Sequence, residues 1–279
     1  MKKVLISNKI ASFVTIAYLF SWLVWFVGMA VVGTSSMEDI WFFVLVGSFG
    51  PSVAALTMTY VENGVYGIKQ LMGSIFRFRF HVTYWLLTLC LLPIIWIIVF
   101  LAFGRAAADT DSTRLAYLTV LISPLNALVG ILGGIGPVGE EIGWRGYLLE
   151  RMLQKYSPLQ TNVTLGGIWA FWHLPIILFF PEFRDDFSIG VFLLLYPLLT
   201  ILLTTMMTNF WNWTNGSIFI AIWIHSLVNI LLNYGGNAIW IEDDANLHPN
   251  IISLIVFAIA AIISSLIFKR KGNRFKEDL

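Results

Sequence analysis

The chain has 279 residues, of which 58% are hydrophobic and 12% are charged, and its formal net charge is +1. An ordinary globular protein carries about 25% charged residues, so this composition argues against a soluble domain. The net charge by itself says nothing about nucleic acid, but the sequence has no basic patch suited to binding it, so we expect no nucleic-acid partner. The single cysteine, Cys90, excludes an intramolecular disulfide.

Apolar runs of about 20 residues recur along the whole length, the pattern of a polytopic membrane protein. We therefore expect an all-α membrane helix bundle of about eight transmembrane helices, forming a single membrane domain over residues 1–279. The expected spans are residues 10–32, 40–61, 83–103, 115–150, 160–180, 188–210, 217–235 and 250–268. The fourth is too long for one crossing. We expect it to cross and then to continue as, or break into, a cytoplasmic helix, with the glycines before Pro137 as the weak point.

The distribution of basic residues predicts how the bundle is oriented. If the N-terminus is inside, fourteen Lys and Arg residues, including Arg145, fall on inside segments, and only Arg105, Arg114 and Arg184 fall outside. The positive-inside rule then places both termini in the cytoplasm. Residues 65–82 carry apolar side chains at helical spacing among basic ones, which predicts a helix lying on the cytoplasmic membrane surface.

Glu140, Glu141 and Arg145 lie in an otherwise apolar stretch. A charged group at the centre of a membrane span costs roughly 2.5–3.5 kcal/mol on insertion scales, so such a group is functional by default. Glu141 and Arg145 are four residues apart, which places them on one helix face as an ion pair. Glu140 is turned about 100° away. Arg145 can thus neutralise Glu141 and leave Glu140 available for chemistry.

Two histidines lie deep in other apolar runs. Trp169 and His173 are four residues apart in span five, where Pro175 weakens the helix, and His225 and Asn229 are four apart in span seven. At about 1.5 Å per helical residue, Glu140, His173 and His225 lie about 15, 20 and 12 Å from the cytoplasmic ends of their spans. We expect these groups and Asn229 to meet in the cytoplasmic half of the bilayer.

Such a cluster suits hydrolysis. A carboxylate with a neutral imidazole can deprotonate a water molecule, which favours Glu140 as the base and His173 as its partner. A second imidazole and an amide, His225 and Asn229, can donate to a developing oxyanion. Alternatively, Glu140, His173 and His225 could bind zinc with an open position for water. The residue types fit either no cofactor or Zn²⁺.

Three motifs on separate spans together resemble the CPBP family of intramembrane proteases, which comprises type II CAAX prenyl proteases and bacteriocin-processing ("abortive infection") proteins. The motifs are Glu140-Glu141-x-x-x-Arg145, Trp169-x-x-x-His173 and His225-x-x-x-Asn229, within a catalytic core of about residues 115–235. The family fold is an eight-helix membrane bundle, in agreement with the span count. At Trp169 the chain departs from the family pattern, which usually has Phe.

The resemblance implies an intramembrane endopeptidase that hydrolyses a peptide bond near the cytoplasmic face. Its partners would be the lipid bilayer and a membrane-associated peptide or lipidated protein, of CaaX-like or bacteriocin and pheromone type. Glu140 and His173 would activate water, and His225 and Asn229 would bind the oxyanion. Glu141 and Arg145 would support the site. A bacterial plasma membrane is the expected location.

Other intramembrane protease motifs are missing: the chain has no HExxH, no GxGD pair and no convincing GxSx serine. An alternative is a proton- or cation-coupled transporter, since intramembrane Glu and His also form ion relays. That reading is weaker because the sequence places one polar cluster, not a file of polar groups across the membrane. A further alternative is a non-catalytic bacteriocin-immunity protein that uses the cluster only for binding. Substrate, metal dependence and oligomeric state stay open.

Overall fold

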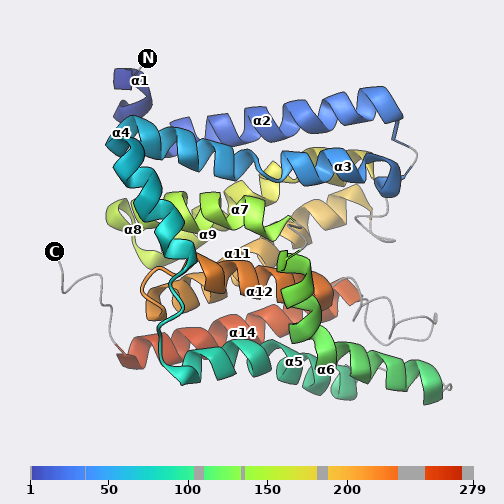
Figure 1. Ribbon diagram of the computed structural model, residues 1–279. Helices are drawn as coiled ribbons and strands as arrows, with labels where there is room; N and C mark the ends of the chain where they lie inside the picture. Colours follow the sequence, from blue (N-terminus) through green and yellow to red (C-terminus); the bar gives the residue numbers. More distant parts are fainter. Residues whose placement is uncertain are drawn as a thin grey trace.

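The structure is a computed structural model that describes residues 2–34, 36–103, 110–132, 136–180, 188–231 and 249–271. Every regular element within these ranges is helical, and Figure 1 shows long helices running side by side in a bundle. Three candidate membrane spans are long and apolar enough to cross a membrane by length and composition: Lys9–Val32, Met37–Ile75 and Ile189–Trp213. Shorter apolar helices accompany them. The predicted all-α polytopic membrane bundle is confirmed.

Each expected span coincides with one helix or with consecutive helices. In chain order these are α1 (Lys2–Ser7), α2 (Lys9–Val32), α3 (Met37–Gly47), α4 (Gly50–Ile75), α5 (Val82–Phe103), α6 (Thr110–Leu132), α7 (Pro137–Gly143), η1 (Trp144–Leu148), α8 (Leu149–Lys155), α9 (Pro158–Trp172), α10 (Leu174–Phe179), α11 (Ile189–Trp213), α12 (Ile218–Ile230) and α14 (Pro249–Lys271). The last residues of the seventh expected span, 232–235, lie outside the described residues.

The fourth expected span is interrupted, as the glycines and Pro137 predict. Helix α6 ends at Leu132 and α7 begins at Pro137, while residues 133–135 lie outside the described part of the chain. Beyond the interruption, the helical path continues through the π-helical turn η1 and α8. Most of α7 and η1 is buried within the bundle. Of these three helices, α8 is the one that lies at the end of the bundle (Figure 1). The continuation is therefore largely an interior element of the bundle, and its predicted place on the cytoplasmic side stays a prediction.

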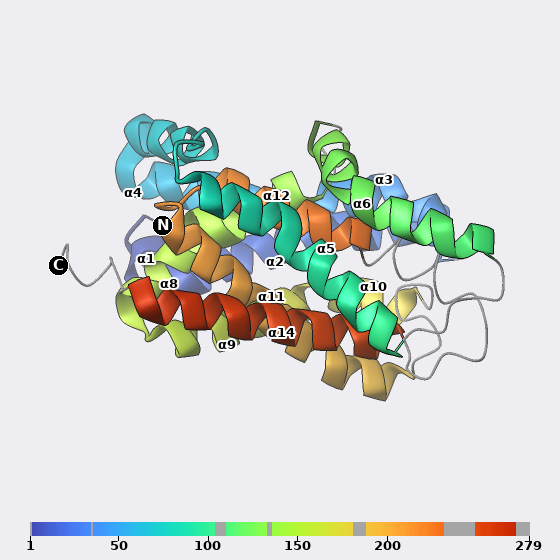
Figure 2. The same ribbon diagram turned by 90° about the horizontal axis from the view of Figure 1, so that it is seen from below.

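Helix α4 changes direction at Gly64, whose backbone (φ +60°, ψ −154°) is not helical. A positive φ is costly for residues with a Cβ, so glycine suits this turn. Beyond it, the second half of α4 runs across the ends of the other helices (Figures 1 and 2). The predicted surface helix therefore corresponds to the segment from Val65 to Ile75, which exposes Val65 and Tyr66 and continues directly from a membrane helix.

The segments expected to face the cytoplasm gather at one end of the bundle. The start of α2, the second half of α4, α8, the turn between α11 and α12, and the end of α14 all lie there (Figure 1). Which side of the membrane this end faces stays a prediction. Arg105 and Arg184 lie outside the described residues, and Arg145 is not a loop charge, because the structure buries it completely.

Two glycines fix α7 against the junction of α3 and α4. A Cβ at Gly143 would lie 2.4 Å from the backbone of Pro51, and a Cβ at Gly139 would lie 2.9 Å from the carbonyl oxygen of Ser48. The Ser52 hydroxyl also donates a hydrogen bond to the Gly139 carbonyl. Only glycine allows backbones to approach this closely. The contact holds the helix that carries Glu140 and Glu141 at a fixed depth in the bundle.

Candidate active site

The predicted ion pair between Glu141 and Arg145 is present. The Arg145 Nη1 donates to Glu141 Oε1 at 2.8 Å, and both side chains are completely buried. Arg145 lies in the π-helical turn η1, a type of distortion that is frequent at functional sites. Nothing in the sequence pattern predicted this turn. Glu140, on the neighbouring helix face, takes no part in the pair.

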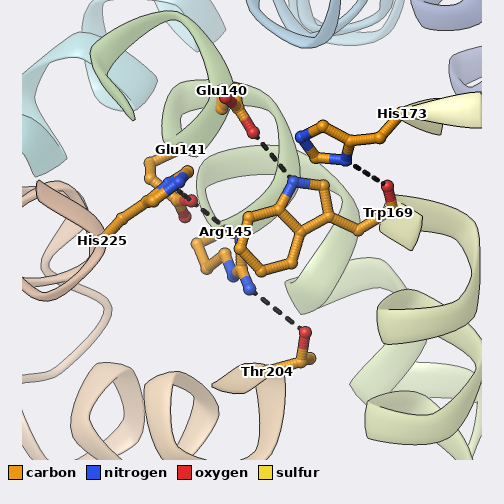
Figure 3. Close-up of polar contacts among 7 residues, drawn as sticks. All are labelled: Glu140, Glu141, Arg145, Trp169, His173, Thr204 and His225. Atoms are coloured by element: carbon orange, nitrogen blue, oxygen red, sulfur yellow. Dashed lines mark hydrogen bonds and ion pairs between the residues drawn. The ribbon is translucent and has the colours of Figure 1, made fainter. Parts of the chain in front are cut away.

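Arg145 has two further neighbours. Its Nη2 donates to the Thr204 hydroxyl on α11 at 3.2 Å, and its guanidinium lies over the Trp169 ring at 4.4 Å from the centroid (Figure 3). Thr204 is a neighbour of the cluster that sequence analysis missed. Its only sequence signal is spacing, since Thr200, Thr204 and Thr208 recur every four residues on one face of α11.

Glu140 is held by a neutral donor. The Trp169 Nε1 donates to Glu140 Oε2 at 2.8 Å, with both side chains buried. The other carboxylate oxygen, Oε1, faces Gly136. A Cβ added to Gly136 would lie 3.8 Å from this oxygen. The two adjacent glutamates thus occupy different surroundings: Glu141 is neutralised by a guanidinium and Glu140 is oriented by an indole.

The helix end at His173 sets the geometry of its imidazole. Helix α9 stops at Trp172, Pro175 lies in the first turn of α10, and the His173 backbone N–H donates to Ala170. The Trp169 carbonyl is thereby released from the helix ladder, and His173 Nδ1 lies 2.9 Å from it. A carbonyl only accepts, so Nδ1 carries the proton and Nε2 of a neutral ring is an acceptor. That second nitrogen faces Glu140 (Figure 3).

His225 approaches the cluster from α12. Its Nδ1 lies 2.8 Å from Glu141 Oε1, the same oxygen that Arg145 contacts. Its ring meets the Trp169 ring edge to face, with centroids 5.1 Å apart and planes at 80°. Because an ionised carboxylate only accepts, Nδ1 donates to Glu141. A protonated ring would then present its Nε2–H as a donor.

The structure therefore brings five of the six predicted site residues together, namely Glu140, Glu141, Arg145, His173 and His225 (Figure 3). The sixth, Asn229, lies one turn further along α12 and is partly buried. Within the part of the chain that the structure describes, no hydrogen bond joins Asn229 to the cluster. Its predicted role depends on a substrate being present.

The predicted zinc alternative requires Glu140, His173 and His225 to converge on one point. Among the described residues, no group of three His, Cys, Asp or Glu side chains is arranged to hold a metal ion. The Nδ1 atoms of both histidines are directed to protein acceptors, Trp169 and Glu141, which is also how a histidine that binds a metal through Nε2 is commonly held. Zinc binding by Glu140, His173 and His225 therefore stays a prediction.

A cavity of about 900 Å³ lies away from this cluster, at the end of the bundle where α8 ends. Its lining is largely polar and includes Lys9, Glu62, Arg77 and Arg151. None of the clustered site residues lines it, although Gly146, the neighbour of Arg145, does. The cavity and the cluster are thus separate features on either side of η1.

Comparison with known proteins supports the family resemblance. Residues 121–231, from α6 to the end of α12, match the model of type II CAAX prenyl endopeptidases, Rce1-like. A curated relative, CAAX prenyl protease 2 of Methanococcus maripaludis, is 20% identical over 274 residues, which cover 91% of this chain and 94% of that protein. The matched range contains the whole cluster. The resemblance to the CPBP family of intramembrane proteases that the three motifs predicted is confirmed, and it agrees with a multi-pass membrane protein.

Proposed function

We propose that the chain is an intramembrane endopeptidase in which Glu140 is the general base. The observation that carries this proposal is the contrast between adjacent glutamates. Glu141 is committed to Arg145 and His225, whereas Glu140 is oriented by one indole N–H and keeps its second oxygen for another partner. A positioned carboxylate in a dry site is suited to proton transfer.

In the first step, Glu140 Oε1 removes a proton from a water molecule while His173 Nε2 accepts the second O–H of that water as a hydrogen bond. The water oxygen forms a bond to the carbonyl carbon of the substrate, and the C=O π electrons move to the carbonyl oxygen. The tautomer of His173 that the Trp169 carbonyl selects is the one this role needs.

The negative oxygen that develops is stabilised by His225, acting as an imidazolium donor through Nε2, and by the Asn229 amide. Glu141 holds the other ring nitrogen of His225, and Arg145 holds Glu141. With His225 protonated, the formal charges of Glu140, Glu141, Arg145 and His225 sum to zero, so the buried cluster carries no net charge at the start of the reaction.

In the second step the tetrahedral intermediate collapses. The carbonyl forms again, the C–N bond breaks, and Glu140 returns the proton it took from water to the departing amine nitrogen. The products are a peptide with a new carboxyl end and a peptide with a new amino end. Every proton and electron pair is accounted for by the water, the substrate and the residues named above.

The substrate that fits this site is a membrane-associated peptide or a lipidated protein, because the cluster is buried in a membrane bundle. The names of the matching family and relative favour a CaaX-like carboxyl-terminal sequence. A bacteriocin or pheromone precursor is the alternative membrane-associated substrate. Cleavage takes place near the cytoplasmic face in either case, by the predicted orientation.

The test is cleavage of membrane-anchored peptides by purified protein. Each peptide is made in prenylated, acylated and unmodified form, and wild type is compared with Glu140→Ala, with and without a strong zinc chelator. We expect wild-type cleavage that the chelator leaves unchanged, and a loss of about 10²- to 10⁴-fold in the mutant. Normal cleavage by Glu140→Ala would refute the proposed base, and loss on chelation with recovery in zinc would make the protein a metalloprotease.

A folded wild-type protein that cleaves none of the peptides would favour the other functions considered from the sequence. Proton flux in liposomes that disappears in Glu140→Gln would then indicate a transporter. Bacteriocin protection that survives both Glu140→Ala and His225→Ala would indicate an immunity protein.

A further inference from the structure

Trp169 is in contact with four of the proposed site residues through four different parts of the residue. Its indole N–H donates to Glu140, and its backbone carbonyl accepts from His173. One face of its ring carries the Arg145 guanidinium, and the His225 ring meets it edge to face. Figure 3 shows this side chain at the centre of the cluster.

We propose that Trp169 is a positioning residue that acts through its indole N–H on Glu140. A carboxylate side chain can rotate so that either oxygen faces a given neighbour. The N–H holds Oε2 at 2.8 Å, which leaves Oε1 as the oxygen that meets water. The donor is neutral, so it orients the carboxylate without forming an ion pair of the kind that engages Glu141.

The N–H is the only one of the four contacts that requires tryptophan. A phenylalanine would keep the backbone carbonyl that holds His173, and it would keep an aromatic face and edge for Arg145 and His225. It would lack a donor for Glu140. Replacing Trp169 by Phe therefore removes one hydrogen bond and leaves the rest of the cluster supported.

Several other buried indole N–H groups in the described part of the bundle lack a hydrogen-bond acceptor, unlike that of Trp169. Within the described residues, the Nε1 atoms of Trp144, Trp172, Trp213 and Trp223 are buried and lack a hydrogen-bond partner. Trp213 is a suitable control, since it is 7% exposed and packs against Tyr84 and Phe210 at the end of α11. Trp213→Phe removes an indole N–H that contacts nothing in the cluster.

The kinetic test compares Trp169→Phe with Trp213→Phe on a peptide that wild type cleaves, and this arm rests on the proposed function. We expect kcat to fall roughly 10- to 100-fold in Trp169→Phe, with KM within about twofold of wild type, because the lost bond orients the base and does not contact the substrate. Trp213→Phe should keep both constants. Wild-type kcat in Trp169→Phe, beside an inactive Glu140→Ala, would overturn the positioning role and leave the proposed function intact.

A spectroscopic test probes the hydrogen bond without any substrate. Protein labelled with ¹⁵N at its indoles gives one N–H resonance per tryptophan, and Trp169→Phe identifies the resonance of Trp169. Replacing Glu140 by Ala should move that resonance towards the position of an unbonded indole, while the resonance of Trp213 stays in place. An unmoved Trp169 resonance would overturn the inference whatever the activity of the protein proves to be.

Discussion

Two arginine–glutamate clusters, six residues apart on one helical path, differ in their surroundings and in what they can do. Arg145 and Glu141 pair at 2.8 Å within a single helical stretch, and both are completely buried. Arg151 pairs with Glu62 at 2.9 Å and thereby joins α8 to α4, with the two side chains 17% and 7% exposed. Lys9 at 3.5 Å and the Tyr147 hydroxyl complete this second cluster beside the polar cavity.

The difference shows how position decides the role of a charge. A buried ion pair gains little net stability, because removing two charges from water costs nearly as much as their attraction returns. Its value in the first cluster is that it holds His225 through Glu141. The second cluster is partly exposed and links three helices, α2, α4 and α8, so we expect it to help hold the bundle together.

Arg145→Met should have the largest effect on stability, because it leaves Glu141 as a buried charge with one fewer partner. We expect a loss of about 3–5 kcal/mol in unfolding free energy, measured by denaturant unfolding in detergent. Adding Glu141→Gln to Arg145→Met should recover much of the loss. A double variant no more stable than Arg145→Met alone would mean that the cost is one of packing and not of charge.

His225→Ala should reduce kcat/KM by about 10²- to 10³-fold, equivalent to about 2.7–4 kcal/mol, because it removes the main donor to the oxyanion. The unfolding free energy should change less than in Arg145→Met. Steady-state kinetics on one cleaved peptide gives the first quantity. Activity close to wild type would show that the oxyanion is stabilised elsewhere.

Asn229→Ala should have a smaller effect, a loss of about tenfold in kcat/KM, or about 1.4 kcal/mol. The reason is distance, since Asn229 lies a turn beyond His225 and forms no hydrogen bond to the cluster among the described residues. Asn229→Asp offers a sharper comparison, because an added negative charge would repel the oxyanion. An Asp variant more active than the Ala variant would speak against an oxyanion contact.

Arg151→Met should cost the least, about 1 kcal/mol in unfolding free energy, since Lys9 and the Tyr147 hydroxyl remain as partners of the Glu62 carboxylate. Its kcat/KM should stay within about threefold of wild type. Lys155→Met is the matched control, because that lysine is exposed on the same helix and its ammonium lies over the Tyr156 ring, away from Glu62. A large kinetic effect of Arg151→Met would show that the two clusters act as one functional unit.

The sequence predicted the features that depend on local spacing. Apolar runs located the spans, the four-residue spacing predicted the pair of Glu141 and Arg145, and Pro175 predicted the helix end at His173. The sequence also predicted that His173 and His225 meet the glutamates, because few polar residues lie deep within the apolar spans.

What sequence analysis missed depends on contacts between distant segments. Thr204 shows no sequence pattern beyond its spacing on α11, yet its hydroxyl accepts a hydrogen bond from Arg145, 59 residues earlier in the chain. The pair of Glu62 and Arg151 joins residues 89 apart. The π turn at Arg145 and the turn of α4 at Gly64 reflect how the helices pack, and a lone glycine in an apolar run does not reveal the direction of the bend.

The most direct measurement of the central claim compares the same substitution in the two clusters. Glu140→Gln and Glu62→Gln each replace a carboxylate by an amide of similar shape. The account predicts that Glu140→Gln loses at least about 10²-fold in kcat while Glu62→Gln stays within about threefold of wild type. Equal losses in the two variants, or full activity in Glu140→Gln, would contradict the assignment of the chemistry to the buried cluster.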